Sequence, residues 1–216
     1  MFVRARGLLG GSLVLVALAV GACGGGSDPG GGGGGDSSAL GGQPTVAGQI
    51  SGWTRGAQTL RLGIDKQLDM LMSAPIDAAG NFSVVLPSVG VVLPFAKKED
   101  FSSGSVAGCQ GTVSATPPIY TAAYLKLTVA IGNQTLYVAQ SATKDLAETL
   151  TRYVYVDRQV DQTGSSTCPT SGTWNYDLHY KQGWNRVLDT ADPNLGPFTL
   201  NIATGATPAG AVWVAR

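Results

Sequence analysis

The feature that most constrains the fold of this chain is an alternation of apolar and polar residues from Thr45 onward. In the stretch TLRLGI, for example, Leu60, Leu62 and Ile64 are each separated by a single residue. Successive side chains of a strand point to opposite faces, so this period is typical of half-buried strands. Helical periodicity is nearly absent. We therefore expect a mostly stranded domain with these interior side chains: Leu60, Leu62, Ile64, Phe82, Val84, Leu127, Val129, Val154, Val156 and Leu200.

The turns between these runs indicate how the strands connect. Gly132-Asn133 fits a two-residue hairpin that needs a positive φ at its first position. Residues 181–183, Lys-Gln-Gly, are expected to join the flanking strands in a similar three-residue turn. One short helix is expected at TKDLAETL, residues 143–150, capped by Thr143. About ten strands are expected, at residues 46–53, 59–64, 81–87, 124–131, 134–140, 151–157, 174–180, 184–188, 198–203 and 210–214.

Many short strands with frequent turns are typical of β-sandwiches and barrels. Within that class, residues 45–87 resemble the opening of a carboxypeptidase-regulatory-like or transthyretin-like sandwich, through VAGQISGW, TLRLGI and APIDAAGNFSVVLP. That resemblance implies an adhesive or accessory domain without catalytic residues of its own. We expect an all-β fold, an immunoglobulin-like or prealbumin-like β-sandwich of about ten strands over residues 45–216. It forms one domain, or two small subdomains that divide near residues 90–118.

Residues 1–22 have the parts of an export signal. Arg4 and Arg6 precede an apolar run at residues 8–20, and small residues follow it. The run has 13 residues, whereas a membrane-spanning helix needs about 20. We therefore expect this segment to be a signal peptide that is removed.

The residues Val20-Gly21-Ala22-Cys23 resemble the lipobox of bacterial lipoproteins. The resemblance implies a diacylglycerol on Cys23, cleavage just before it, and acylation of the new amino terminus. Acyl chains at this position would anchor the protein to a membrane without a spanning helix. The protein would then face the periplasm or the exterior of the cell. An ordinary signal peptide cut near Cys23 is the alternative.

A glycine-rich segment follows Cys23 and separates it from the predicted domain. Of the 21 residues at 23–43, 11 are glycine, a composition that cannot bury enough apolar surface to fold. We expect a flexible linker over residues 23–44, with a reach of about 25 Å. Loss of Arg4 and Arg6 from the 14 basic residues would leave 12 basic against 14 acidic side chains. This balance, without a basic cluster, argues against nucleic acid as a partner.

Three cysteines form an even pair once Cys23 is assigned to lipid. Cys109 and Cys168 both lie in stretches rich in Gly, Ser and Thr, and an exported chain usually reaches an oxidising compartment. We expect a disulfide between them, with two unpaired thiols as the alternative. Neither belongs to a CxxC pair, which argues against zinc binding and redox catalysis.

His179 is the single histidine of the chain. Alternation on WNYDLHYK puts it beside Asp177 on the polar face, opposite Trp174, Tyr176, Leu178 and Tyr180. A distant serine could complete a hydrolase triad, but no GxSxG elbow is present, so we assign no catalytic residue.

Two acidic loops and the tryptophans are the remaining candidate sites. Calcium needs six to eight oxygen ligands, and the loops at Asp77 to Asn81 and Asp189-x-x-Asp192-x-Asn194 each offer only two or three. We therefore expect no metal and no cofactor. The tryptophans are expected to pack mostly in the core, although with the tyrosines they could form a platform for sugars or peptides: Trp53, Trp174, Trp184 and Trp213.

These observations favour a lipid-anchored protein of the cell envelope whose β-domain is not an enzyme. It would bind a protein, a glycan or a surface component. The alternative is a lipid-anchored hydrolase with a site built from polar loops. A cleft holding His179, a carboxylate and a serine would favour the hydrolase. A transporter's solute-binding component is disfavoured, because the chain has no alternating strand and helix pattern.

Overall fold

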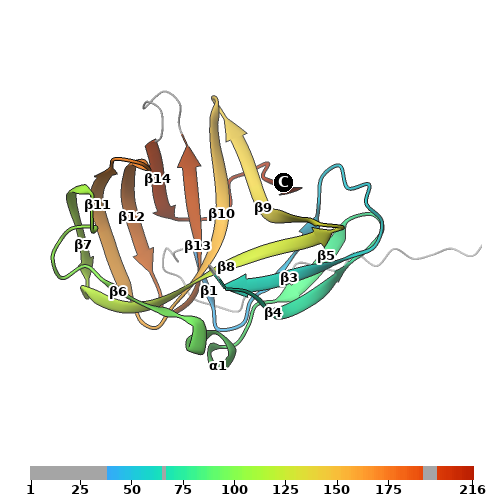
Figure 1. The fold of residues 1–216 in the computed structure, drawn as a ribbon, viewed down its shortest axis with the longest axis horizontal. Helices are drawn as coiled ribbons and strands as arrows, with labels where there is room; N and C mark the ends of the chain where they lie inside the picture. Colours follow the sequence, from blue (N-terminus) through green and yellow to red (C-terminus); the bar gives the residue numbers. More distant parts are fainter. Residues whose placement is uncertain (1–37, 65–66, 192–198) are drawn as a thin grey trace, which may run out of the picture. The chain divides into compact units, whose positions relative to one another are not determined.

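The structure is a computed structural model that describes residues 38–64, 67–191 and 199–216 (Figure 1). Within these ranges the chain is almost entirely stranded, which confirms the predicted all-β class. Two single-turn helices, α1 (Val89–Val92) and η1 (Leu93–Phe95), interrupt the described strands. Those strands are β1 (Ala39–Gly41), β2 (Thr45–Gln49), β3 (Gln58–Ile64), β4 (Gln67–Ile76), β5 (Asn81–Val85), β6 (Lys97–Asp100), β7 (Gln110–Thr116), β8 (Ile119–Ile131), β9 (Gln134–Lys144), β10 (Ala147–Val156), β11 (Val160–Cys168), β12 (Gly172–Tyr180), β13 (Gly183–Ala191), β14 (Thr199–Thr204) and β15 (Val212–Ala215).

All of these strands belong to one hydrogen-bonded network. Its main path runs β2-β5-β4-β3-β8-β9-β10-β13-β14-β12-β11-β7, while β1 joins β13, β6 joins β8 and β15 joins β9. A sandwich consists of two separate sheets that face each other. A continuous network of this kind does not confirm the predicted sandwich.

The buried side chains follow the alternation seen in the sequence. In β3, Leu60, Leu62 and Ile64 are buried while Arg61 is exposed. The other residues predicted to be interior are also buried, with one difference: Leu200 of β14 is half-buried and packs against the edge of a core. Period-two patterning therefore predicts the inward faces of these strands correctly.

Strands β8 and β10 are buried on both faces because they separate two apolar cores. On β10, Tyr153 and Tyr155 belong to the first core, whereas Val154 and Val156 belong to the second. The sheet forks at the same place, since β8 pairs with β10 over residues 122–125 and with β9 over residues 128–131. The second core lies on the side of β11, β12 and β14, where the candidate site is found.

The predicted helix at residues 143–150 is wrong. These residues form the ends of β9 and β10 and the hairpin turn between them. The turn residues Asp145 and Leu146 have φ values of 50° and 71°, as a two-residue hairpin of type I′ requires. Local helix propensity is overridden here by the strand pairing of Lys144 with Ala147.

The predicted turn at 181–183 is present, but the strands that it joins are not paired. Gly183 has a φ of 100°, and the Asn185 side chain bonds the backbone of Lys181 and Gly183. Beyond the turn β12 and β13 separate, and β14 lies between them, parallel to β12 and antiparallel to β13 (Figure 1). Turn chemistry fixes the change of direction, but it does not determine which strand becomes the neighbour.

The sequence interpretation missed five of the described strands: β1, β4, β6, β7 and β11. β1 lies inside the range 23–44 expected as linker, and it pairs with β13. β7 and β11 are rich in Gly, Ser and Thr, so their apolar alternation is weak and they resemble loops. Exposed threonine and serine are nevertheless well accommodated on the solvent face of a sheet.

Candidate functional site

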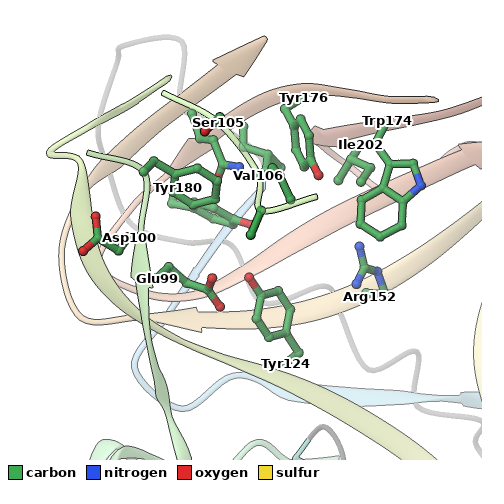
Figure 2. A pocket seen from close by; sticks show the side chains of 14 residues that line it. Glu99, Asp100, Ser105, Val106, Tyr124, Arg152, Trp174, Tyr176, Tyr180 and Ile202 are labelled. Atoms are coloured by element: carbon green, nitrogen blue, oxygen red, sulfur yellow. The ribbon is translucent and has the colours of Figure 1, made fainter. Parts of the chain in front are cut away.

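A cavity of about 350 Å³ lies over the second core (Figure 2). One wall is β12, whose side chains Trp174, Tyr176, Leu178 and Tyr180 all line it. The predicted alternation of this strand is confirmed, because these four residues share one face. Neighbouring strands complete the wall with Arg152, Gln162, Ile202 and Tyr124.

The opposite side of the cavity is formed by β6 and the loop that follows it. Glu99 and Asp100 come from β6, while Phe101 and Val106 come from the β6–β7 loop. Backbone hydrogen bonds hold the first half of this loop, from Phe101 N to Pro118 O at 2.8 Å and from Val113 N to Gly104 O at 3.0 Å. Near the end of the loop, Cys109 N donates to Val106 O at 3.0 Å. The loop is thus an ordered cover on the aromatic wall.

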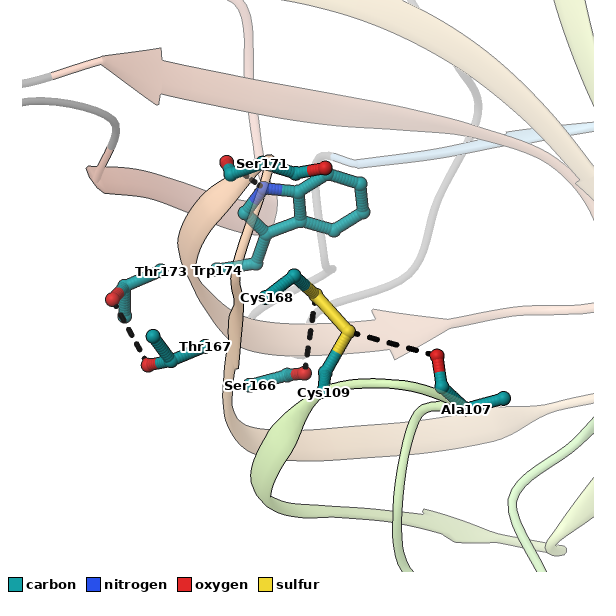
Figure 3. The surroundings of a disulfide bond; sticks show 8 residues. All are labelled: Ala107, Cys109, Ser166, Thr167, Cys168, Ser171, Thr173 and Trp174. Atoms are coloured by element: carbon teal, nitrogen blue, oxygen red, sulfur yellow. Dashed lines mark hydrogen bonds between the residues drawn. A yellow bond between two sulfur atoms is a disulfide. The ribbon is translucent and has the colours of Figure 1, made fainter.

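The predicted disulfide between Cys109 and Cys168 is confirmed (Figure 3). It joins the end of the β6–β7 loop to the last residue of β11, across a sequence separation of 59 residues. β11 also contributes Gln162 to the cavity. The disulfide therefore ties the cover of the cavity to its wall.

Arg152, which lines the cavity, forms an ion pair with Asp189 of β13. The Arg152 Nη2 donates to Asp189 Oδ1 at 2.6 Å, and its Nε lies against the second carboxylate oxygen. Burial raises the pKa of Asp189 above its ordinary value, and the Arg152 guanidinium partly offsets this rise. Arg152 thus reaches the cavity with much of its charge already compensated.

The tyrosines of the cavity remain protonated at neutral pH. Burial raises the pKa of Tyr176 to about 12 and that of Tyr124 well above its ordinary value. The negative charge of Glu99 adds to both rises. Beneath them, the Tyr120 hydroxyl donates to Gln162 Oε1 at 2.6 Å and fixes the orientation of that amide. These phenols are suited to binding by stacking and hydrogen bonding, and they are poor bases or nucleophiles.

His179 lies on the opposite face of β12, exposed to solvent as predicted. The predicted contact with Asp177 is present, with 3.1 Å between Nε2 and Oδ1. A second carboxylate, Asp161 of β11, lies 2.8 Å from Nδ1. Hydrogen bonding to Asp161, supported by Asp177, raises the pKa of His179. Because each ring nitrogen already faces a carboxylate, none is left to activate a serine hydroxyl.

The acidic loops use their side chains within the fold. Asp77 accepts hydrogen bonds from the backbone of Ala79 at 2.8 Å and of Asn81 at 2.9 Å, and so stabilises its own turn. Asp189 is held by Arg152, while Asp192 and Asn194 lie outside the described residues. Among the residues that are described, no three His, Cys, Asp or Glu side chains gather as metal ligands would.

The four tryptophans occupy different environments. Trp184 and Trp213 are buried in the first core, and Trp53 is half-buried against it. Trp174 instead lines the cavity, where its indole N–H donates to Ser171 O at 3.1 Å. The expectation of core packing holds for most of them, and Trp174 belongs to the candidate site.

The sequence interpretation did not identify Glu99, Tyr124 or Arg152 as site residues. They come from three different strands and form no local motif. The detectable signal was the run WNYDLHY, which concentrates three aromatic residues on one strand face. Such a face over a core is typical of either packing or a binding wall.

The predicted signal peptide and the lipid-bearing Cys23 lie outside the described residues. In the part of the chain that is described, neither helix has the length and apolar character that a membrane span requires. Comparisons with protein-family models, with curated proteins and with solved structures find no match to this chain.

Proposed function

We propose that this protein is a lipid-anchored binding protein of the cell envelope, and that the cavity over β12 holds a small organic ligand. The observation that carries this proposal is the cavity itself. Its volume of about 350 Å³ suits a small molecule. Aromatic faces meet a small number of charged and polar groups there, which is the usual composition of a ligand site.

A binding role is favoured over the alternative hydrolase by the protonation states of the cavity. The tyrosines hold their protons, and Arg152 is engaged by Asp189. His179, the chain's single histidine, lies on the other face of β12 with both nitrogens occupied. A serine hydrolase would need a hydroxyl activated by a base. Ser105 lines the cavity, but its hydroxyl lies 3.2 Å from Ser103 Oγ, and His179 is not among the described lining residues.

The proposed location depends on the lipobox-like residues that end at Cys23. Acyl chains there would attach the protein to the membrane, and the glycine-rich linker would leave the domain free to meet its ligand. The rigid wall and the disulfide-tied cover support a site that is formed before the ligand arrives. Preformed sites lose less conformational entropy on binding.

The proposal is tested by asking which small molecules accompany the protein. The full chain is purified from the membranes of its own cells, unfolded, and the released compounds are identified by mass spectrometry. Val106→Trp fills the cavity from its cover, whereas Val89→Trp is a matched change at an exposed valine of α1. We expect a compound that accompanies the wild-type protein and Val89→Trp but is lost from Val106→Trp. No accompanying compound, or one that Val106→Trp retains, would contradict the proposal.

A further inference from the structure

We propose that the ligand of this cavity is an organic cation, an amine or a quaternary ammonium ion. This inference rests on the proposed function, because it names the chemical class that the same cavity would select. Two independent properties of the cavity support it. One is the arrangement of its aromatic rings, and the other is the sign of its charges.

Aromatic rings surround the cavity from several directions (Figure 2). Trp174, Tyr176 and Tyr180 project from β12, Tyr124 lies on β8, and Phe101 belongs to the cover. The face of each ring carries negative electrostatic potential, and a cation near several such faces is attracted to all of them. Enclosure by aromatic rings is the means by which proteins commonly recognise quaternary ammonium groups.

Carboxylates outnumber cationic groups among the described residues that line the cavity. Glu99 and Asp100 line it, and among the described lining residues Arg152 alone is positive. Asp189 compensates the charge of Arg152 through their ion pair. Lys98 lies 3.7 Å from Asp100, and both side chains are well exposed to solvent, so this ion pair contributes little.

The negative charge of Glu99 also reaches across the cavity. Besides burial, it adds to the rise in the pKa of Tyr124, Tyr176 and Tyr180, which stand on two different strands. The Arg152 guanidinium acts in the opposite direction at all three tyrosines. A carboxylate in the wall of a cavity favours a positive group placed beside it.

Calorimetry with matched probes tests this inference on the full chain in nonionic detergent. Choline is compared with 3,3-dimethylbutan-1-ol, its neutral carbon analogue, and benzylamine is compared with benzyl alcohol. N-acetylglucosamine serves as a neutral sugar probe. We expect at least one cation to bind at least tenfold more tightly than its neutral partner, and more tightly than the sugar.

Two charge variants locate the effect. Glu99→Gln removes the carboxylate charge but keeps the side-chain shape, and we expect it to weaken binding of the preferred cation about fivefold to tenfold. Asp145→Asn makes the same change of net charge at the tip of the β9–β10 hairpin, outside the cavity, and should leave the affinity unchanged. Val106→Trp should abolish the binding.

Three results would overturn the inference: equal binding of a cation and its neutral partner, preference for the sugar, or unchanged affinity in Glu99→Gln. Failure of the proposed function is distinguished from these by the released compounds. If the released compound is neutral or anionic and is absent from Val106→Trp, the proposed binding function stands and the proposal of a cationic ligand is refuted. Absence of any cavity-dependent compound, together with no probe binding, refutes both.

Discussion

Removal of the Cys109–Cys168 disulfide provides the most quantitative test of how this domain is held together. The bond closes a chain segment of 59 residues. Loop-closure entropy for a segment of that length corresponds to about 4 kcal/mol at room temperature. We therefore expect the double variant Cys109→Ser, Cys168→Ser to lose about 4 kcal/mol of unfolding free energy. For a domain of this size, that loss lowers the thermal midpoint by roughly 8–16 °C.

Urea denaturation followed by circular dichroism measures this loss directly. The single variant Cys109→Ser is the control, because it breaks the same bond and should lose a similar free energy. The strand signal of the folded variants should match that of the wild type, since the entropic effect acts on the unfolded chain. A loss below about 1 kcal/mol would refute the view that the bond constrains a long unfolded loop. Probe binding should also weaken, because the cover of the cavity is no longer tied to β11.

Three other changes test separate parts of the structure. Gly48→Ala should lose roughly 1–3 kcal/mol in urea denaturation, because a Cβ there would lie 2.1 Å from Trp213 Nε1. Asp161→Asn should lower the unfolding free energy at about pH 5.5 by less than about 1 kcal/mol, because the His179–Asp161 pair is exposed. At about pH 9 it should have little effect. This pH dependence follows from the raised pKa of His179. The stabilisation by the His179–Asp161 pair is complete below the ordinary histidine pKa, and it is lost as the pH rises through the raised pKa of His179. Cys23→Ser should move the protein from the membrane fraction to the soluble fraction, or leave an uncleaved precursor, as blots of fractionated cells would record.

Controls make these outcomes decisive. Gly42→Ala introduces a Cβ with no atom within 4 Å, so it should not change the unfolding midpoint. Equal midpoints for Gly48→Ala and Gly42→Ala would contradict the close packing against Trp213. An effect of Asp161→Asn that grows with rising pH would contradict the assigned ion pair. If Cys23→Ser remains processed and bound to membranes after a high-salt wash, the acyl chains are not the anchor.

The strand faces could be predicted from the sequence because burial of one face imposes a local period. Leu60, Leu62 and Ile64 needed only their own spacing to be assigned to the interior. The helix expected at residues 143–150 failed because Lys, Leu, Ala and Glu favour helix locally, whereas pairing of β9 with β10 decides the outcome. The place of β14 between β12 and β13 depends on contacts distant in sequence, which no turn signal encodes.

The cavity was predictable only in part, for a related reason. Its aromatic wall on β12 follows from alternation within a single strand. Its charged groups Glu99 and Arg152 come from β6 and β10, and Asp189, which pairs with Arg152, comes from β13; these residues meet only when the sheet forms. The disulfide could be predicted because few cysteines leave few pairings.

The most direct test of the central claim, that the cavity over β12 is the ligand site, uses the tryptophan indoles as reporters. Two-dimensional ¹H–¹⁵N NMR resolves the indole N–H groups while choline or benzylamine is added to the full chain in detergent. We predict that the Trp174 signal shifts and saturates, because its indole lines the cavity. The signals of Trp53, Trp184 and Trp213 should stay in place, because these residues pack in or against the first core. A titration in which one of those three shifts while Trp174 does not, or in which no indole signal moves, would contradict the claim.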